Sequence, residues 1–174
     1  KPYPSSIVRL IFLKNLYISI AKGAPPETKN LICPPKSLLI LLNMSISVII
    51  PYYNESETIL KTLRSIACQS YTPDEVLLID SGSTDKTSLL IDEWIKTNKM
   101  NQYRNIYSGM MSPSSSINKG IKNSKNKLIA YMDCGLEIPK NWLMSNYKLL
   151  NKAESDIVST VIYTAGKSII DQSF

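Results

Sequence analysis

The chain has 174 residues, 44% of them hydrophobic, which is enough for one globular domain and too few for two. It contains no histidine, so Ser-His and Cys-His nucleophilic dyads and histidine-based metal sites are excluded. Its 3 cysteines are far apart and odd in number, which predicts neither a disulfide framework nor a zinc site. They indicate a reducing, cytoplasmic setting.

The formal net charge of +6 is concentrated near the start of the sequence. Residues 1–43 hold 6 basic residues and 1 acidic residue, whereas residues 44–174 hold 14 basic and 13 acidic residues. The main segment is therefore nearly neutral, which argues against general electrostatic binding to nucleic acid. We expect no nucleic-acid partner.

We interpret residues 1–43 as an N-terminal extension of unknown role, because Met44 stands directly before the first predicted strand and is a candidate natural start. The basic, apolar segment 7–20 has two interpretations: peripheral contact with an anionic membrane surface, or a poorly ordered extension. No stretch of the sequence reaches the roughly 18 uninterrupted apolar residues of a membrane-spanning helix.

From residue 45 the chain alternates between strand and helix patterns. Short apolar runs bounded by turn residues predict buried strands, and apolar residues at helical spacing predict helices. Asn54 is expected to cap the first helix, with Glu57 returning the hydrogen bond, and Ser112 with Pro113 to open the third. The expected strands are 45–50, 76–79, 105–107, 127–132 and 157–163; the expected helices are 54–69, one from about 84, 112–123 and one from 139. This order predicts an α/β fold with right-handed crossovers and a mostly parallel sheet flanked by helices.

Polar loops follow three of the predicted strands, at residues 51–55, 80–85 and 133–137. Parallel sheets bind ligands beyond the carboxyl ends of their strands, so neighbouring strands would bring these loops to one crevice. Carboxylates of the second and third loops would then repel each other unless a cation lay between them. A divalent ion held by Asp oxygens and by the phosphates of a ligand would remove that cost.

Four segments, in this order, resemble the nucleotide-sugar-binding half of a family 2 glycosyltransferase: SVIIPYYNES, LLIDSGSTDKT, SSSINKGIKNSKNKLIAYMDCG and IPKNWL. The resemblance covers residues 45 to about 163. It implies a Rossmann-like GT-A fold, with residues 44–174 as its donor-binding part, incomplete at the C-terminus. It also implies inverting transfer from a UDP, dTDP or GDP sugar to a glycan, lipid-linked or protein acceptor, in cell-envelope polysaccharide biosynthesis.

The resemblance further implies a donor site at the three loops. The loop after the first strand would hold the base and ribose, and the acidic turn after the second strand would complete that pocket. Asp133 would bind a divalent cation, Mg²⁺ or Mn²⁺, through the diphosphate. The implied nucleotide-sugar-binding residues are Pro51, Tyr52, Asn54, Glu55, Asp80, Ser81 and Asp133.

The chain departs from the family's pattern at three places. It has Asp80-Ser81 where many members have two consecutive Asp, which leaves the nucleotide open. It has Asp133-Cys134-Gly135 where Asp-x-Asp is common, so one carboxylate remains. Glu137 is then an alternative ligand, or it simply favours the start of the next helix. Where an Arg often approaches the diphosphate the chain has Ser116-Ile117-Asn118, followed by Lys119 as a candidate replacement.

These features also have purely structural interpretations. The segment 80–85 is equally typical of a helix-capping turn in which Gly82 supplies an unusual φ. The candidate caps of that turn are Ser83 and Thr84. Lysines 119, 122, 125 and 127 are typical of a solvated face rather than a phosphate clamp. Trp94 and Trp142 lie among apolar helix positions and are interpreted as core residues.

The family's catalytic base lies downstream of the metal motif, so we expect it beyond Phe174 and assign no catalytic residue within the chain. The late acidic residues Asp156 and Asp171 do not match it. The main hypothesis is therefore an enzyme, a glycosyltransferase represented by its donor-binding part. The alternative is a non-catalytic nucleotide-binding or interaction fragment that keeps the fold.

Overall fold

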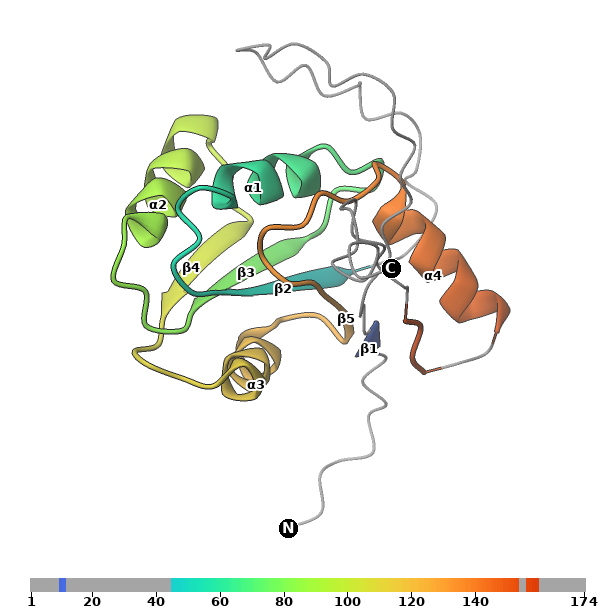
Figure 1. Ribbon diagram of the computed structural model, residues 1–174. Coiled ribbons are helices and arrows are strands. Elements are labelled where there is room, and N and C mark those ends of the chain that lie inside the picture. The colour runs from blue at the N-terminus through green and yellow to red at the C-terminus, as the bar shows by residue number, and fades with distance from the viewer. Residues whose placement is uncertain (1–9, 12–44, 154–155, 160–174) are drawn as a thin grey trace, which may run out of the picture.

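The computed structural model describes residues 10–11, 45–153 and 156–159, and Figure 1 shows its elements. The strands are β1 (Leu10–Ile11), β2 (Ile46–Tyr52), β3 (Glu75–Asp80), β4 (Tyr103–Tyr107) and β5 (Leu128–Tyr131). The helices are α1 (Ile59–Ala67), α2 (Thr87–Asn98), α3 (Pro113–Asn123) and α4 (Trp142–Lys152). The candidate membrane-surface segment 7–20, apart from β1, and Asp171 lie outside the described residues.

The strands form one sheet in the order β1-β5-β2-β3-β4, and every pair is parallel. From β2 the chain steps outward through α1 to β3 and through α2 to β4. It then crosses back through α3 to β5, on the other side of β2. Helix α3 packs on one face of the sheet, and α1, α2 and α4 pack on the other. A crevice therefore forms at the carboxyl end of the sheet, between the β4–α3 connection and the loops after β2, β3 and β5. The predicted α/β fold with a parallel sheet is confirmed.

Helices cover both faces of the sheet (Figure 1). Side chains alternate between the faces of a strand, so Val48 and Ile50 point to one face while Ile49 points to the other. The first face packs against α1, α2 and α4, and its core includes Trp94 and Trp142, as predicted. The second face packs against α3 through Ile49, Leu77, Ile79 and Ile129. Nearly continuous apolar strands fit a sheet that is buried on both sides.

Helix α3 lies very close to β2, because it carries a glycine at the point of contact. A Cβ on Gly120 would be 2.4 Å from Cγ2 of Ile49, so no larger residue fits without movement. The helix begins as predicted: Ser112 is its N-cap and accepts a hydrogen bond from the Ser115 amide at 3.3 Å, and Pro113 occupies the first turn. This packing brings the N-terminus of α3 to the crevice.

The predicted start of the first helix is wrong. Asn54 has a left-handed φ of 52°, whereas an N-cap residue needs an extended backbone. Helix α1 begins five residues later at Ile59, after a turn in which the Glu55 carbonyl accepts from the amides of Thr58 and Ile59. Asn54 and Glu57 therefore form no capping box.

Two other helices also begin later than expected, at Thr87 and at Trp142. A bend at residues 85–86 precedes the first of these helices, and a turn at residues 140–141 precedes the second. The predicted strand 157–163 is described only at residues 157–159, where Ile157 forms a single bridge; residues 160–163 lie outside the described part.

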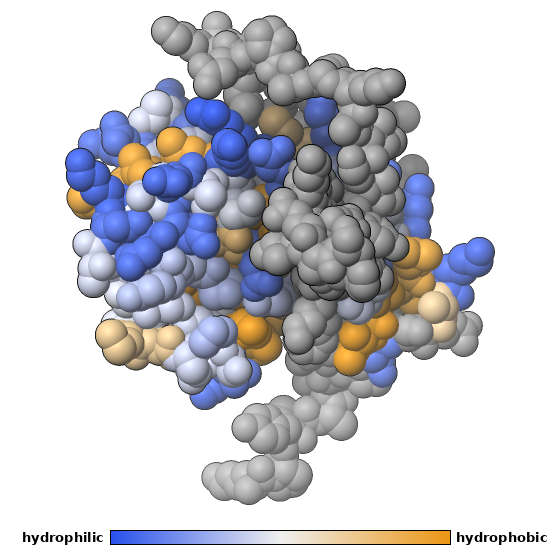
Figure 2. Space-filling model, viewed as in Figure 1, coloured by the Kyte–Doolittle hydropathy of each residue, from blue (hydrophilic) through white to orange (hydrophobic). Residues whose placement is uncertain are grey.

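Figure 2 shows mostly hydrophilic side chains over α1 and α2, and a group of hydrophobic ones over α4. Leu149 of α4 is 49% exposed. None of the helices among the described residues is both long enough and apolar enough to cross a bilayer.

Candidate nucleotide-binding cleft

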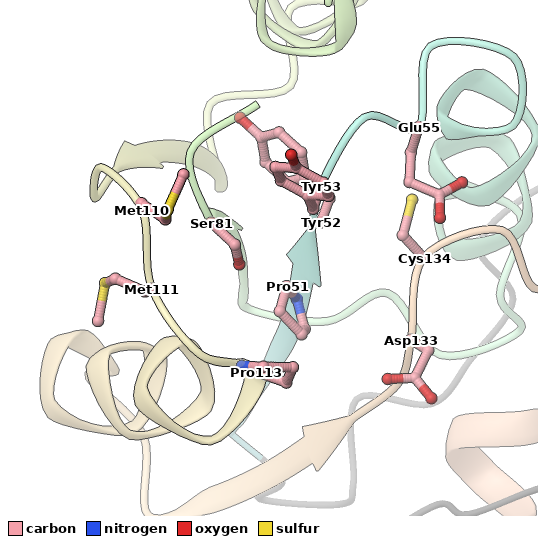
Figure 3. Close-up of a pocket in the computed structure, with 10 residues that line it drawn as sticks. All are labelled: Pro51, Tyr52, Tyr53, Glu55, Ser81, Met110, Met111, Pro113, Asp133 and Cys134. Atoms are coloured by element: carbon pink, nitrogen blue, oxygen red, sulfur yellow. The ribbon is translucent and has the colours of Figure 1, made fainter. Parts of the chain in front are cut away.

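A cleft of about 390 Å³ lies at the carboxyl ends of β2, β3 and β5. Figure 3 shows Glu55, Cys134 and Asp133 along one wall, and Ser81, Met110, Met111 and Pro113 along the other. Pro51, Tyr52 and Tyr53 lie between these walls. The cleft lies beyond the carboxyl ends of the strands, which is where open parallel sheets bind ligands.

Five of the predicted binding residues line this cleft: Pro51, Tyr52, Glu55, Ser81 and Asp133. The other two, Asn54 and Asp80, do not line it and instead bond to the protein itself.

Asn54 joins the loop after β2 to the loop after β3. Its Oδ1 accepts hydrogen bonds from the amides of Thr84, at 2.8 Å, and Asp85, at 3.3 Å. Its own amide donates to Ser83 Oγ at 3.0 Å. The positive φ, which asparagine tolerates better than most residues, turns the side chain toward that second loop. Asn54 therefore holds two walls of the cleft together.

Asp80 holds the turn that follows β3. Its Oδ1 accepts from the amides of Gly82, at 3.1 Å, and Ser83, at 2.8 Å. Gly82 has a φ of 96°, and a Cβ there would lie 2.8 Å from the Met110 Cα. Glycine thus allows this turn to pass against the loop that carries Met110, which closes one side of the cleft. The unusual φ predicted for Gly82 is confirmed.

Asp85 links this turn to Glu55. Its Oδ1 accepts from the Thr87 amide, the first of α2, at 3.0 Å. Neither expected cap, Ser83 nor Thr84, is the N-cap residue of α2, which is Lys86. Its Oδ2 accepts from the Ser56 amide at 3.1 Å, and Thr87 Oγ1 accepts from the Glu55 amide at 2.8 Å. Desolvation raises the pKa of Asp85, but the hydrogen bonds from Thr87 and Ser56 outweigh it and lower the pKa to about 2.

Ser81 connects the cleft to α3. Its Oγ lies 2.8 Å from Oγ of Ser116, and both side chains are buried. The Met111 amide donates to the Ser81 carbonyl at 3.3 Å. These contacts fix the wall formed by the β3 turn and the start of α3.

Tyr52 contributes its ring to the cleft while its hydroxyl points elsewhere. The hydroxyl lies 2.8 Å from Ser88 Oγ and donates to Asn105 Oδ1 at 2.7 Å, on the side of α2 and β4. Burial raises the pKa of Tyr52, so the phenol stays protonated at neutral pH.

The opposite wall is built on the turn 133–135. Thr62, which is fully buried, accepts from the Gly135 amide at 3.0 Å. Thr58 donates to Glu55 Oε2, and Gly135 lies so close that a Cβ on it would be 3.5 Å from that oxygen. Burial, together with the nearby Glu55 carboxylate, raises the pKa of the Cys134 thiol to about 12.

Asp133 is the only aspartate among the residues that line the cleft, and it is exposed. The Tyr131 hydroxyl donates to its Oδ1. Burial, and then this hydrogen bond to Asp133, raise the pKa of Tyr131. No group of three or more acidic or cysteine side chains within the described residues is placed to hold a metal ion.

Several other candidate residues lie away from the cleft. Lys119 donates through Nζ to the Tyr107 carbonyl at 3.1 Å, and the lysines at 122, 125 and 127 are exposed. Glu137 and Asp156 are exposed and do not line the cleft.

Sequence reasoning missed five lining residues. Tyr53 and Cys134 are neighbours of predicted ones, so proximity in sequence was an available signal. Met110 and Met111 come from the connection between β4 and α3, and Pro113 is the first residue of α3; none of the three has a polar side chain. Their position depends on α3 crossing to the other face of the sheet, and only the tertiary structure shows this.

Comparison with known proteins connects this cleft to one family. Residues 47–171 match the family Glycosyl transferase family 2. An uncharacterized glycosyltransferase of Rickettsia conorii is 35% identical over 94 residues, which cover 54% of this chain and 15% of that protein. Glycosyltransferase AglE of Haloferax volcanii is 30% identical over 115 residues, which cover 65% of this chain and 38% of AglE.

Two solved structures are also similar to this chain. TarS of S. aureus in complex with UDP matches with a TM-score of 0.55 and 26% identity, over 64% of this chain and 33% of that one. A mannosyltransferase of Pyrobaculum calidifontis in complex with GDP-Man and Mn²⁺ matches with a TM-score of 0.57 and 25% identity, over 60% and 32%. The chain thus spans less than half of the length of each of these four proteins.

Proposed function

Since the chain belongs to glycosyl transferase family 2, we propose that its cleft binds the nucleotide part of a nucleotide sugar and that the protein transfers the sugar to an acceptor. The observation that carries this proposal is the position of the cleft. It lies beyond the carboxyl ends of the parallel strands and combines apolar lining residues with Asp133, just after β5.

The lining suits a nucleotide. The half-buried ring of Pro51 and the exposed ring of Tyr53 offer apolar surface for a base and ribose. Position 81 is a serine, whose hydroxyl is hydrogen-bonded to Ser116. Base recognition therefore does not depend on a carboxylate at that position. The nucleotides of the neighbours are UDP and GDP-Man, so we propose UDP, dTDP or GDP sugars as the donor class.

We propose that Asp133 holds a divalent cation, Mg²⁺ or Mn²⁺, together with the diphosphate. A single protein carboxylate suits such an ion, because Mg²⁺ keeps several waters and needs only one or two protein carboxylates besides substrate phosphates. Asp133 Oδ1 accepts from Tyr131, while Oδ2 receives no hydrogen bond from the residues that the structure describes. When bound, the cation would neutralise charge on the leaving diphosphate.

The rest of the reaction is part of the same proposal. Transfer proceeds with inversion to a glycan, lipid-linked or protein acceptor, and a carboxylate base removes the acceptor proton. Among the described residues only Glu55 and Asp133 are acidic and line the cleft, and Glu55 is bonded to Thr58. We therefore assign no catalytic base here. We also propose a cytoplasmic setting, which the free thiol of Cys134 supports.

The test is metal-dependent nucleotide binding by the variant Asp133→Asn, measured by calorimetry with UDP, dTDP and GDP. We expect the gain in affinity that Mn²⁺ gives over EDTA to fall at least about ten-fold, or about 1.4 kcal/mol. Asp92→Asn is the matched control, because Asp92 also accepts from a tyrosine but lies outside the cleft. Glu137→Gln tests the alternative ligand. A full Mn²⁺ effect in Asp133→Asn would contradict the assignment.

A further inference from the structure

Tyr131 is the residue that restrains the lone aspartate of the cleft, although it does not line the cleft itself. We propose that Tyr131 is a positioning residue, which holds the Asp133 carboxylate so that its Oδ2 faces the bound cation. This proposal rests on the proposed function, because it assigns Asp133 to the cation of the donor site.

The backbone fixes where Tyr131 stands. It is the last residue of β5, a strand that pairs with β2 on one side and β1 on the other. Tyr131 is in register with Ile49, and the next amide, Met132, donates to the Ile49 carbonyl at 3.2 Å. The backbone is therefore fixed by β2 at Tyr131 and again at Met132, directly before Asp133.

The alternation of an extended chain brings the two side chains together. Residues two apart on such a chain project to the same side, so Tyr131 and Asp133 can meet without any distortion. Tyr131 is half-buried, whereas Asp133 is exposed beside the cleft. A partly buried ring is a fixed support for an exposed carboxylate.

This restraint matters because the chain has one carboxylate at this turn. Asp133 is followed by Cys134 and Gly135, and neither supplies a second acidic ligand. A free aspartate would lose rotational freedom when it binds a cation, and a preformed hydrogen bond reduces that loss. Hydrogen-bond partners behind metal ligands typically change metal affinity by about 10- to 100-fold.

The experiment compares Tyr131→Phe with Tyr107→Phe. Each substitution removes a hydroxyl that donates to an aspartate, but the Tyr107–Asp92 pair lies outside the cleft. Affinities for UDP, dTDP and GDP are measured by calorimetry in EDTA and in Mn²⁺. For Tyr131→Phe we expect affinity in EDTA to stay unchanged and the Mn²⁺ gain to fall about ten-fold. Tyr107→Phe should change neither value.

A double variant separates positioning from a general structural effect. In the Asp133→Asn background, Tyr131→Phe should cause no further loss, because the two residues act through one interaction. An undiminished Mn²⁺ gain in Tyr131→Phe, or equal losses in both backgrounds, would overturn the positioning role alone. If the unaltered protein itself bound no nucleotide, the proposed function would fall, and this inference with it.

Discussion

Cys134 brings a thiol into the cleft beside Asp133, but its surroundings keep that thiol protonated. Burial and the Glu55 carboxylate raise its pKa to about 12, and its Sγ lies 3.9 Å from Thr62 Oγ1. Since the thiolate is the reactive form, such a cysteine is a packing residue of the wall.

We predict that iodoacetamide labels Cys134 slowly in the folded protein at pH 8. In urea the pKa of Cys134 returns to about 8.5, so a larger fraction of the thiol is ionised at pH 8. Labelling should then accelerate at least about ten-fold, even though a thiolate of lower pKa is intrinsically less nucleophilic. Peptide mapping by mass spectrometry measures both rates. Equal rates in the folded and unfolded protein would show that the thiol is not protected.

At the residue scale, the sequence identified the loops that form the cleft. It did not show which of their side chains line the cleft and which hold the loops in place. Asn54 and Asp80 carry polar groups typical of ligand contacts, yet the loop backbone takes their side chains as hydrogen-bond acceptors. Whether an asparagine binds a ligand or a neighbouring loop depends on its φ, and the left-handed value at Asn54 is set by the turn. Periodicity carries no information about that angle.

At the scale of elements, the loops after β2 and β3 behave as one unit. Asn54 reaches from the first loop to the second, while Asp85 and Thr87 accept from amides of the first. Loops that are already hydrogen-bonded to each other lose less conformational entropy when a ligand binds. The cleft is therefore preorganised on this side.

This unit predicts a pH dependence of stability. The folded pKa of Asp85, about 2, lies below its unfolded value of about 3.9, so its charge stabilises the fold. That contribution is fully present above about pH 4 and is lost as the pH falls through about 2. We expect the difference in urea midpoint between the unaltered protein and Asp85→Asn to shrink between pH 5 and pH 3. A difference that stays constant over this range would contradict the assignment.

Element types and the start of α3 followed from the sequence, but the starts of α1, α2 and α4 did not. The apolar spacing of Ile59, Leu63 and Ile66 predicts a helix, and all three are buried in the core. Its first turn was misplaced because the residues after Asn54 form a separate turn closed by the Glu55 carbonyl. A capping box would use the amides of Asn54 and Glu57, whereas the observed turn uses those of Thr58 and Ile59. The sequence pattern alone does not indicate which of the two forms.

At the scale of the whole molecule, chain order determines the cleft. The crossovers through α1 and α2 run on one face of the sheet, and the one through α3 runs on the other. The last one returns past β2, so β5 lies beside β2 and Asp133 lies across the cleft from Ser81 (Figure 3). The alternation of strands and helices predicts this class of fold. It does not predict that Met110 and Met111 complete the cleft, because that requires the actual path of the β4–α3 connection.

Calorimetric titration of the protein with UDP, dTDP and GDP, each in Mn²⁺ and in EDTA, tests the central claim most directly. We predict that at least one of these nucleotides binds, and binds more tightly in Mn²⁺, because the cleft offers ring surfaces for the base and Asp133 for the cation. The absence of binding by all three nucleotides under both conditions would contradict the account of this cleft as a nucleotide-sugar site.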